Sequence, residues 1–99
     1  MNEWVFADAA NTAVFTTRQV VEQGLPIRSV WHDGDDGGWQ FLCGTTNAES
    51  DLRIVGLGEI VRLDPSVREV ADLPRGWVAW RSLRSDAWHR APRPARDAD

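Results

Sequence analysis

Residues 27–43, IRSVWHDGDDGGWQFLC, decide the fold class of this chain. Two apolar runs, residues 27–32 and residues 39–43, flank the segment DGDDGG, which consists entirely of turn-forming residues. Apolar runs of this length around such a segment are typical of a β-hairpin. We therefore expect two antiparallel strands joined by an acidic, glycine-rich loop.

Trp39 and Phe41 are the expected core residues of this hairpin. Successive side chains of a strand point to opposite faces of the sheet, so these two aromatic residues share a face. The sequence does not choose the pairing register. One register places Trp31 on the face of Phe41, and a slip of one residue places it on the opposite face.

The segment before the hairpin predicts a strand that ends at Phe15 and leads directly into a short helix. Thr16 and Gln19 have the spacing of a capping box, in which each side chain bonds the backbone N–H of the other residue. Phe15 and Val20 then have the spacing of a hydrophobic staple. Gly24 suits the left-handed position that ends a helix.

The second half of the chain predicts two helices and a final strand. Leu57 and Ile60 have the spacing of a helix with one buried face. Asp64 and Pro65 fit the N-cap and the first helical position of a second helix, because proline lacks an N–H that would be unpaired there. Residues 77–81 form the last apolar run.

Together with an apolar run at residues 4–6, read as a possible strand, these elements predict an α+β fold. We expect a small, mostly antiparallel sheet with two or three short helices. Ninety-nine residues hold a single domain, which we place at residues 1–85. Residues 86–99 are polar and contain Pro92 and Pro94, so we expect a disordered C-terminal tail.

The composition is typical of a soluble globular protein, with 42% apolar and 26% charged residues. Cys43 is the only cysteine, so no intramolecular disulfide can form. No apolar run approaches the ~20 residues that span a bilayer, and the N-terminal residues lack the features of a secretory signal. We therefore expect a cytoplasmic protein with no membrane partner.

The formal net charge of −4 is unevenly distributed. Residues 1–74 contain twelve acidic residues and five arginines, whereas residues 75–96 contain six arginines and one acidic residue. Arginines and tryptophans interleave in the second segment, and this pattern can bind nucleic acid or another polyanion. Because the larger part of the chain is acidic, polyanion binding is the alternative, and a basic protein partner is the first expectation.

Neither a metal site nor a catalytic group is predicted. An EF-hand loop starting at Asp33 matches at positions 1, 3 and 6, but Gly37 and Gly44 occupy positions 5 and 12, where ligands are needed. A thiolate nucleophile needs a base within about 3 Å, whereas Cys43 and His32 belong to opposite ends of the predicted hairpin. We expect no enzyme activity, cofactor or metal.

Between about residues 13 and 82, short motifs follow one another in a specific order. They are Gly38-Trp39-x-Phe41-x-x-Gly44, Leu57-x-x-Ile60, Asp64-Pro65-x-Val67, Pro74-x-Gly76 and Ala79-x-Arg81. In order and spacing they resemble the bacterial immunity protein 33 family, first named domain of unknown function 2185. The resemblance implies an α+β, non-enzymatic protein that binds and neutralises a cognate toxin, and it supplies no catalytic residues.

The chain departs from this family at three places. The segment of residues 45–51 is shorter and less acidic than the corresponding segment of family members. Trp77 occupies a position where many members have a smaller residue. Residues 88–99 lie outside the pattern.

An immunity role needs only a stable surface that is complementary to a toxin. An acidic loop could cover the basic site of a toxin that attacks nucleic acid, and exposed tryptophans would anchor the interface. The candidate partner-binding residues are therefore Asp33, Asp35, Asp36, Trp31 and Trp80. Structural roles are expected instead for the motif residues Gly38, Trp39, Phe41, Gly44, Asp64, Pro65, Pro74 and Gly76.

Overall fold

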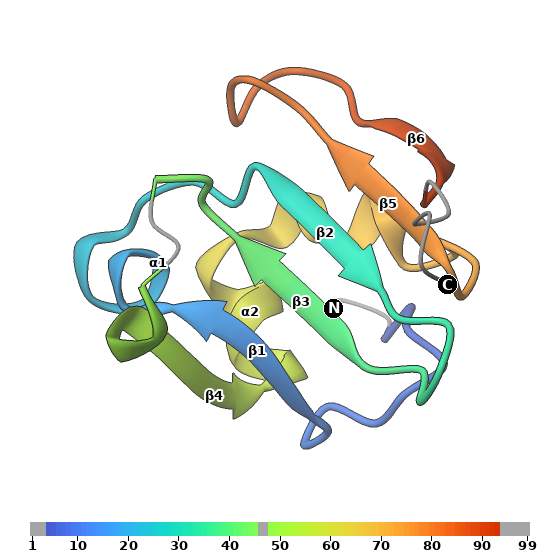
Figure 1. The fold of residues 1–99 in the computed structure, drawn as a ribbon, viewed down its shortest axis with the longest axis horizontal. Helices are drawn as coiled ribbons and strands as arrows, with labels where there is room; N and C mark the ends of the chain where they lie inside the picture. Colours follow the sequence, from blue (N-terminus) through green and yellow to red (C-terminus); the bar gives the residue numbers. More distant parts are fainter. Residues whose placement is uncertain (1–3, 46–47, 94–99) are drawn as a thin grey trace.

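The computed structural model describes residues 4–45 and 48–93 of the chain. Within these residues a six-stranded sheet has the order β4-β1-β3-β2-β5-β6 (Figure 1). Neighbouring strands are antiparallel except for β1 and β3, which are parallel. Short helices complete the fold, so the predicted α+β class with a mostly antiparallel sheet is confirmed.

The elements alternate along the chain rather than forming separate blocks. The strands are β1 (Ala13–Thr17), β2 (Ser29–His32), β3 (Trp39–Leu42), β4 (Leu52–Gly56), β5 (Trp77–Trp80) and β6 (His89–Pro92). The α-helices are α1 (Arg18–Gln23) and α2 (Leu57–Leu63), and the 3-10 helices are η1 (Glu49–Asp51) and η2 (Pro65–Val70).

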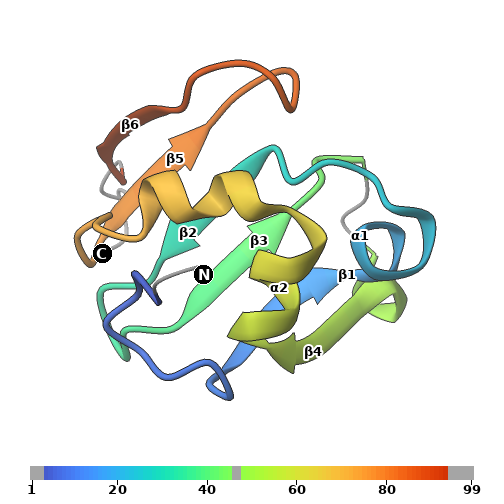
Figure 2. The ribbon, with the colours of Figure 1, turned by 180° about the vertical axis from the view of Figure 1, so that it is seen from behind.

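The core lies between one face of the sheet and the layer formed by α2 and η2. Figure 2 shows these two helices across the back of the sheet, whereas the front seen in Figure 1 carries no helix over its strands. Phe41 is fully buried and Trp39 is 3% exposed, which confirms the expected burial of both aromatic residues. Ile60 and Val67 meet them from the helix layer in one core cluster.

The hairpin between β2 and β3 is antiparallel, as predicted, and its register is now defined. Val30 pairs with Phe41, and Trp31 pairs with Gln40. Paired residues share a face, so Val30 enters the core beside Phe41 and Trp31 lies on the opposite face. Val30 is accordingly fully buried, whereas Trp31 is half-buried on the uncovered face.

The predicted capping box before α1 is wrong. Thr16 belongs to β1 and is fully buried, and its hydroxyl donates to the Phe41 carbonyl at 2.7 Å. Thr17 is the N-cap and makes no side-chain capping bond. The predicted staple also fails, because Phe15 is 40% exposed while Val20 is buried. Gly24 does end the helix, with a left-handed φ of 69°.

The apolar run at residues 4–6 is not a strand. Phe6 is buried instead and packs edge-on against Trp39, with ring centroids 5.3 Å apart. A strand that the sequence pattern did not predict, β4, lies at the sheet edge and pairs with β1 over five residue pairs. β4 joins the sheet through its pairing with β1, a strand that lies far from β4 in the sequence.

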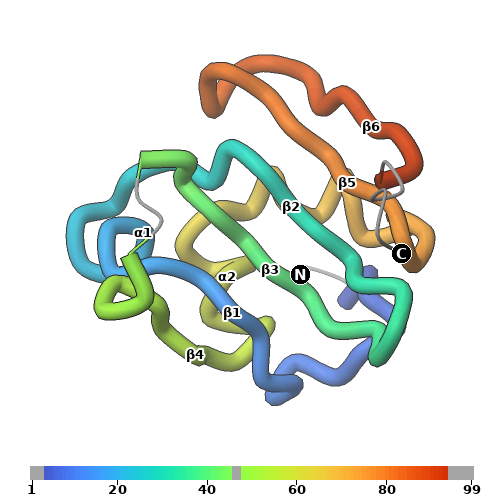
Figure 3. The backbone as a smooth tube through the Cα atoms, in the orientation of Figure 1, coloured from blue at the N-terminus to red at the C-terminus, as the bar shows by residue number. Residues whose placement is uncertain are grey.

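The expected disordered tail is wrong for residues 89–92. They form β6, which pairs with β5 along the far edge of the sheet, as the tube in Figure 3 shows. Trp88 anchors this return, since its indole N–H donates to the Ser66 carbonyl at 3.2 Å. The last part of the predicted tail, residues 94–99, lies outside the described residues.

A buried ion pair joins the helix layer to the sheet. Arg81 follows β5 and places Nη2 2.9 Å from Oδ2 of Asp64, and both side chains are at most 3% exposed. Asp64 is the N-cap of η2, as predicted, and accepts from the backbone N–H of Ser66. Arg81 Nε and Nη1 donate to the carbonyls of Ile27 and Arg84, so each of the three guanidinium nitrogens makes a hydrogen bond.

The other motif residues lie in turns and in the core. Gly44 and Gly76 have left-handed φ values of 77° and 82°, which favour glycine. The carbonyl of Pro74 accepts from the Trp77 backbone N–H at 3.1 Å and closes the turn before β5. These contacts give the motif residues structural explanations.

We predict that Arg81→Met lowers the free energy of unfolding by about 3–5 kcal/mol, because it leaves the Asp64 carboxylate buried and unpaired. Arg62→Met is the matched control, since Arg62 pairs with Glu59 on the surface and should change stability far less. Urea denaturation of both variants measures the difference. Equal losses for the two variants would contradict the structural role of the buried pair.

Phe41→Ala should cost about 3–5 kcal/mol of stability, because it opens a cavity in the centre of the core. The matched control is Phe15→Ala on the exposed face, which should cost less than about 1 kcal/mol. Thermal and urea unfolding of both proteins test this. A Phe41→Ala protein that unfolds together with wild type would show that the core is placed incorrectly.

Candidate protein-binding face

The face of the sheet opposite α2 and η2 carries several large apolar side chains. Phe15, Leu52, Ile54 and Trp80 are 40%, 45%, 63% and 43% exposed, and Trp31 is half-buried among them. We call the surface formed by these five residues the open face. Single exposed apolar residues are ordinary, whereas several on one side of a sheet are typical of an interaction surface.

The strand register shows that the open face is continuous across the sheet. Ile54 pairs with Phe15, Phe15 pairs with Gln40, Gln40 pairs with Trp31, and Trp31 pairs with Val78. Because directly paired residues point to the same side, these five side chains form one row that crosses β4, β1, β3, β2 and β5.

A second, parallel row lies two residues further along the strands. Thr17 pairs with Leu52 at one edge, and Ser29 pairs with both Leu42 and Trp80 towards the other. The exposed tryptophan of β5 therefore lies on the same side as Trp31 of the first row. The structure thus places the two predicted tryptophans on one surface, together with apolar residues of β1 and β4 that the sequence did not single out.

Asp33 lies at the rim of the open face and is already engaged. Its carboxylate accepts from the Gln40 side-chain amide at 3.2 Å, and Arg93 approaches it to 3.5 Å. The Arg93 guanidinium also lies 5.2 Å from the ring centroid of Trp31. This candidate residue therefore ties the loop to β3 and to the end of β6, and its charge is compensated.

Asp35 and Asp36 lie at the exposed tip of the hairpin loop. Asp36 accepts from the backbone N–H of Gly38 at 2.8 Å, which closes the turn. Within the described residues, neither carboxylate has an arginine partner, and the same is true of Asp8. Negative charge without an arginine partner thus collects at the hairpin end of the sheet.

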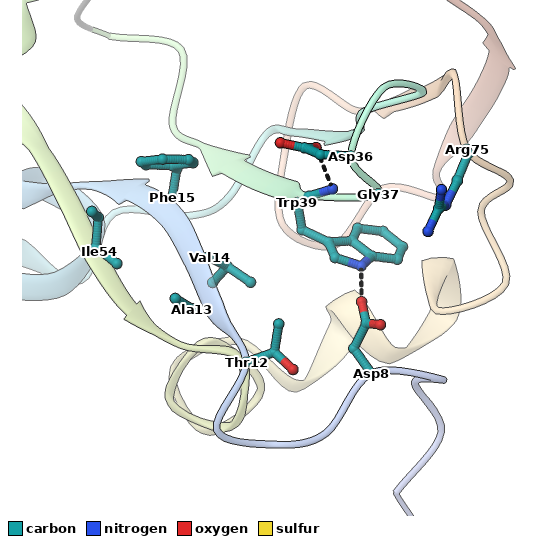
Figure 4. Close-up of a pocket in the computed structure, with 11 residues that line it drawn as sticks. Asp8, Thr12, Ala13, Val14, Phe15, Asp36, Gly37, Trp39, Ile54 and Arg75 are labelled. Atoms are coloured by element: carbon teal, nitrogen blue, oxygen red, sulfur yellow. Dashed lines mark hydrogen bonds between the residues drawn. The ribbon is translucent and has the colours of Figure 1, made fainter.

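A cavity of about 380 Å³ opens between the first residues of β1 and β3. Figure 4 shows Phe15 and Ile54 on one side, Trp39 at the centre, and Asp8 below it. The indole N–H of Trp39 donates to Oδ2 of Asp8 at 2.8 Å. Arg75 lies beyond Gly37 at the other end of the cavity.

Sequence reasoning missed three residues of this cavity, Asp8, Ile54 and Arg75. They belong to an N-terminal turn, an edge strand and the loop before β5, and the cavity alone brings them together. No spacing in the chain relates the three positions, so no sequence pattern could have grouped them.

Cys43 and His32 are kept apart, as expected. The Cys43 sulfur contacts the hydroxyls of Thr17 at 3.3 Å and Thr45 at 3.1 Å. Burial acts to raise the pKa of this thiol, but the hydrogen bonds outweigh burial and leave the pKa below its usual value. His32 lies at the other end of the hairpin, where its ring stacks on Trp39 with centroids 3.8 Å apart.

The arginine–tryptophan segment is largely occupied by contacts within the domain. Arg81 is buried against Asp64, and its guanidinium lies 3.9 Å from the ring centroid of Trp88. Arg90 pairs with Asp72, and Arg93 approaches Asp33. These arginines neutralise the acidic residues of the same chain. The pairing reduces their availability to an external polyanion.

Among the described residues there is no group of three or more histidine, cysteine or acidic side chains placed to hold a metal ion. In the same part of the chain, no helix has the length and apolar character required to cross a membrane. No family model, curated protein or solved structure matches the chain.

Calorimetric titration with Ca²⁺, Mg²⁺ and Zn²⁺ should show no binding tighter than about millimolar, the weak end of the range for calcium modules. The physical reason is that Asp33 is engaged by Gln40 and Arg93, and that the described residues contain no group of three or more acidic, histidine or cysteine side chains placed to hold a metal ion. A micromolar site that disappears in Asp33→Ala would contradict this prediction.

Proposed function

We propose that this protein is a non-enzymatic binding protein that docks a basic protein partner on its open face. The observation that supports this most directly is the group of large apolar and aromatic side chains that β1, β2, β4 and β5 place on the side of the sheet that the helix layer does not cover. Burying such side chains stabilises a complex by roughly 25 cal/mol per Å² of apolar area, before the costs of association.

Two properties of the open face suit a protein partner. Tryptophan is enriched among the residues that dominate binding energy, and Trp80 is exposed near the edge formed by β5 and β6. The paired strands beneath the face also hold its side chains in fixed positions. Binding therefore loses little backbone entropy, and a rigid aromatic surface is an efficient anchor.

The charge distribution favours a basic partner over an acidic one. The chain has a formal net charge of −4, and Asp35 and Asp36, at the hairpin end of the sheet, remain without an arginine partner among the described residues. Complementary charge at the rim of an apolar interface accelerates association and excludes partners of like charge.

We further propose that the partner is a cognate bacterial toxin domain and that the protein acts in the cytoplasm as its immunity protein. The motif resemblance supports this role, and the role requires only a stable domain with one complementary surface. A toxin that attacks nucleic acid would present a basic site to the acidic end of the open face. Binding there would block the site without any chemistry by the immunity protein.

The test purifies the protein encoded by the gene immediately beside this one, which the proposal expects to be a toxin, and titrates it against the full chain in a calorimeter. Trp80→Ala should weaken binding by at least about tenfold, because it removes an aromatic anchor of the open face. Leu83→Ala is the matched control: Leu83 is 62% exposed but follows β5 outside both rows of the open face, so affinity should stay unchanged.

Three results would overturn the proposal. The first is that no toxin gene lies beside this one, or that the product of such a gene does not bind this chain. The second is an equal loss of affinity for Leu83→Ala and Trp80→Ala. The third is submicromolar binding of a single-stranded oligonucleotide at physiological salt, which would favour the polyanion alternative.

A further inference from the structure

We propose that the cavity between the first residues of β1 and β3 receives the arginine or lysine side chain of a basic partner. This inference rests on the proposed function, because it names the chemical group that the partner would insert beside the open face. The volume of about 380 Å³ lies at the small end of the range for ligand pockets, which suits one side chain.

The cavity is continuous with the open face. Phe15 and Ile54 belong to its lining and also to the first row of the open face. A partner that covers this row would therefore lie directly over the cavity mouth. The apolar wall suits the methylene stem of a long basic side chain, since arginine and lysine pack their stems on apolar surfaces and keep the charged head in a polar environment.

The polar part of the lining is acidic on balance. Asp8 uses one carboxylate oxygen, Oδ2, to accept from the Trp39 indole, and Asp36 uses Oδ1 to accept from the Gly38 amide. In each case the second oxygen has no hydrogen bond to another described residue. These two oxygens are available to a donor that enters from outside, and the donor with matching charge is a guanidinium or an ammonium.

Arg75 does not neutralise these carboxylates. Its guanidinium lies against the backbone of Gly37, so closely that a Cβ built on that glycine would come within 2.5 Å of Nη2. The absence of a side chain at Gly37 makes this position possible. Arg75 forms no ion pair with a described residue, and the lining retains two carboxylates against one guanidinium. An anion held by Arg75 alone is the competing possibility.

The experiment titrates the isotope-labelled full chain with Nα-acetyl-arginine methylamide and follows its amide and indole N–H resonances. The Trp39 indole and the Gly38 amide are direct reporters, because they donate to Asp8 and Asp36. We expect both resonances to shift in a saturable manner with a dissociation constant on the order of millimolar. Nα-acetyl-norvaline methylamide, which has an uncharged side chain, should leave them unchanged.

Asp8→Asn and Asp36→Asn should each raise the dissociation constant of the arginine probe by at least about fivefold. Asparagine keeps an oxygen that can accept from the indole or the amide, so both variants should fold, as unchanged remaining resonances would show. Asp35→Asn is the matched control, because Asp35 lies in the same loop but does not line the cavity. Arg75→Gln should lower the dissociation constant of the arginine probe, because it removes a positive charge that repels the probe.

The proposal is overturned if no saturable shift occurs, if norvaline and arginine probes act alike, or if Asp35→Asn weakens binding as much as Asp8→Asn. It is also overturned if Nα-acetyl-glutamate methylamide binds in place of the arginine probe and is lost in Arg75→Gln. Because this titration contains no partner protein, its failure leaves the effect of Trp80→Ala on toxin binding as a separate test of the proposed function.

Discussion

The buried ion pair between Asp64 and Arg81 is the constraint on which the arrangement of the two layers depends. Asp64 begins η2 and Arg81 follows β5, so their contact fixes the helix layer against the sheet. Two charges this far from water are tolerated only when both are hydrogen-bonded, and here the Ser66 amide and the Ile27 carbonyl supply further bonds. Trp88 packs on the Arg81 guanidinium and so holds the chain in place immediately before β6, which pairs with β5.

Because α2 and η2 both cover the same face of the sheet, the two faces of the sheet have different environments. Val30, Phe41 and Val14 fill the covered side, while Phe15 and Trp31 are directed to the other side by the two-residue period of their strands. The open face is thus a direct consequence of the hairpin register. A slip of one residue in this pairing would instead place Trp31 on the same face as Phe41, and the open face would lose this tryptophan.

The contrast between an acidic body and a basic C-terminal segment is largely resolved within the domain. Arg81, Arg90 and Arg93 approach Asp64, Asp72 and Asp33. These contacts draw residues 75–93 onto the sheet and the helix layer, and they leave unpaired acidic groups at the tip of the hairpin. Three arginines of the segment that the sequence offers as a polyanion site are thus engaged by acidic residues of the same chain, whereas Arg75 forms no ion pair with a described residue.

The sequence by itself determined the features of this protein that depend on local interactions. The hairpin loop, the left-handed Gly24, the Asp64-Pro65 helix start and the burial of Trp39 and Phe41 all depend on neighbouring residues or on a short period, so pattern reasoning found them. Only the tertiary structure decided the hairpin register, the recruitment of β4 and β6, and the meeting of Asp8, Ile54 and Arg75 around one cavity. Thr16 shows the physical reason: its hydroxyl could have capped a helix, but a carbonyl 25 residues away offered a buried hydrogen bond instead. Contacts of that kind depend on which strands become neighbours, and no short stretch of sequence specifies that.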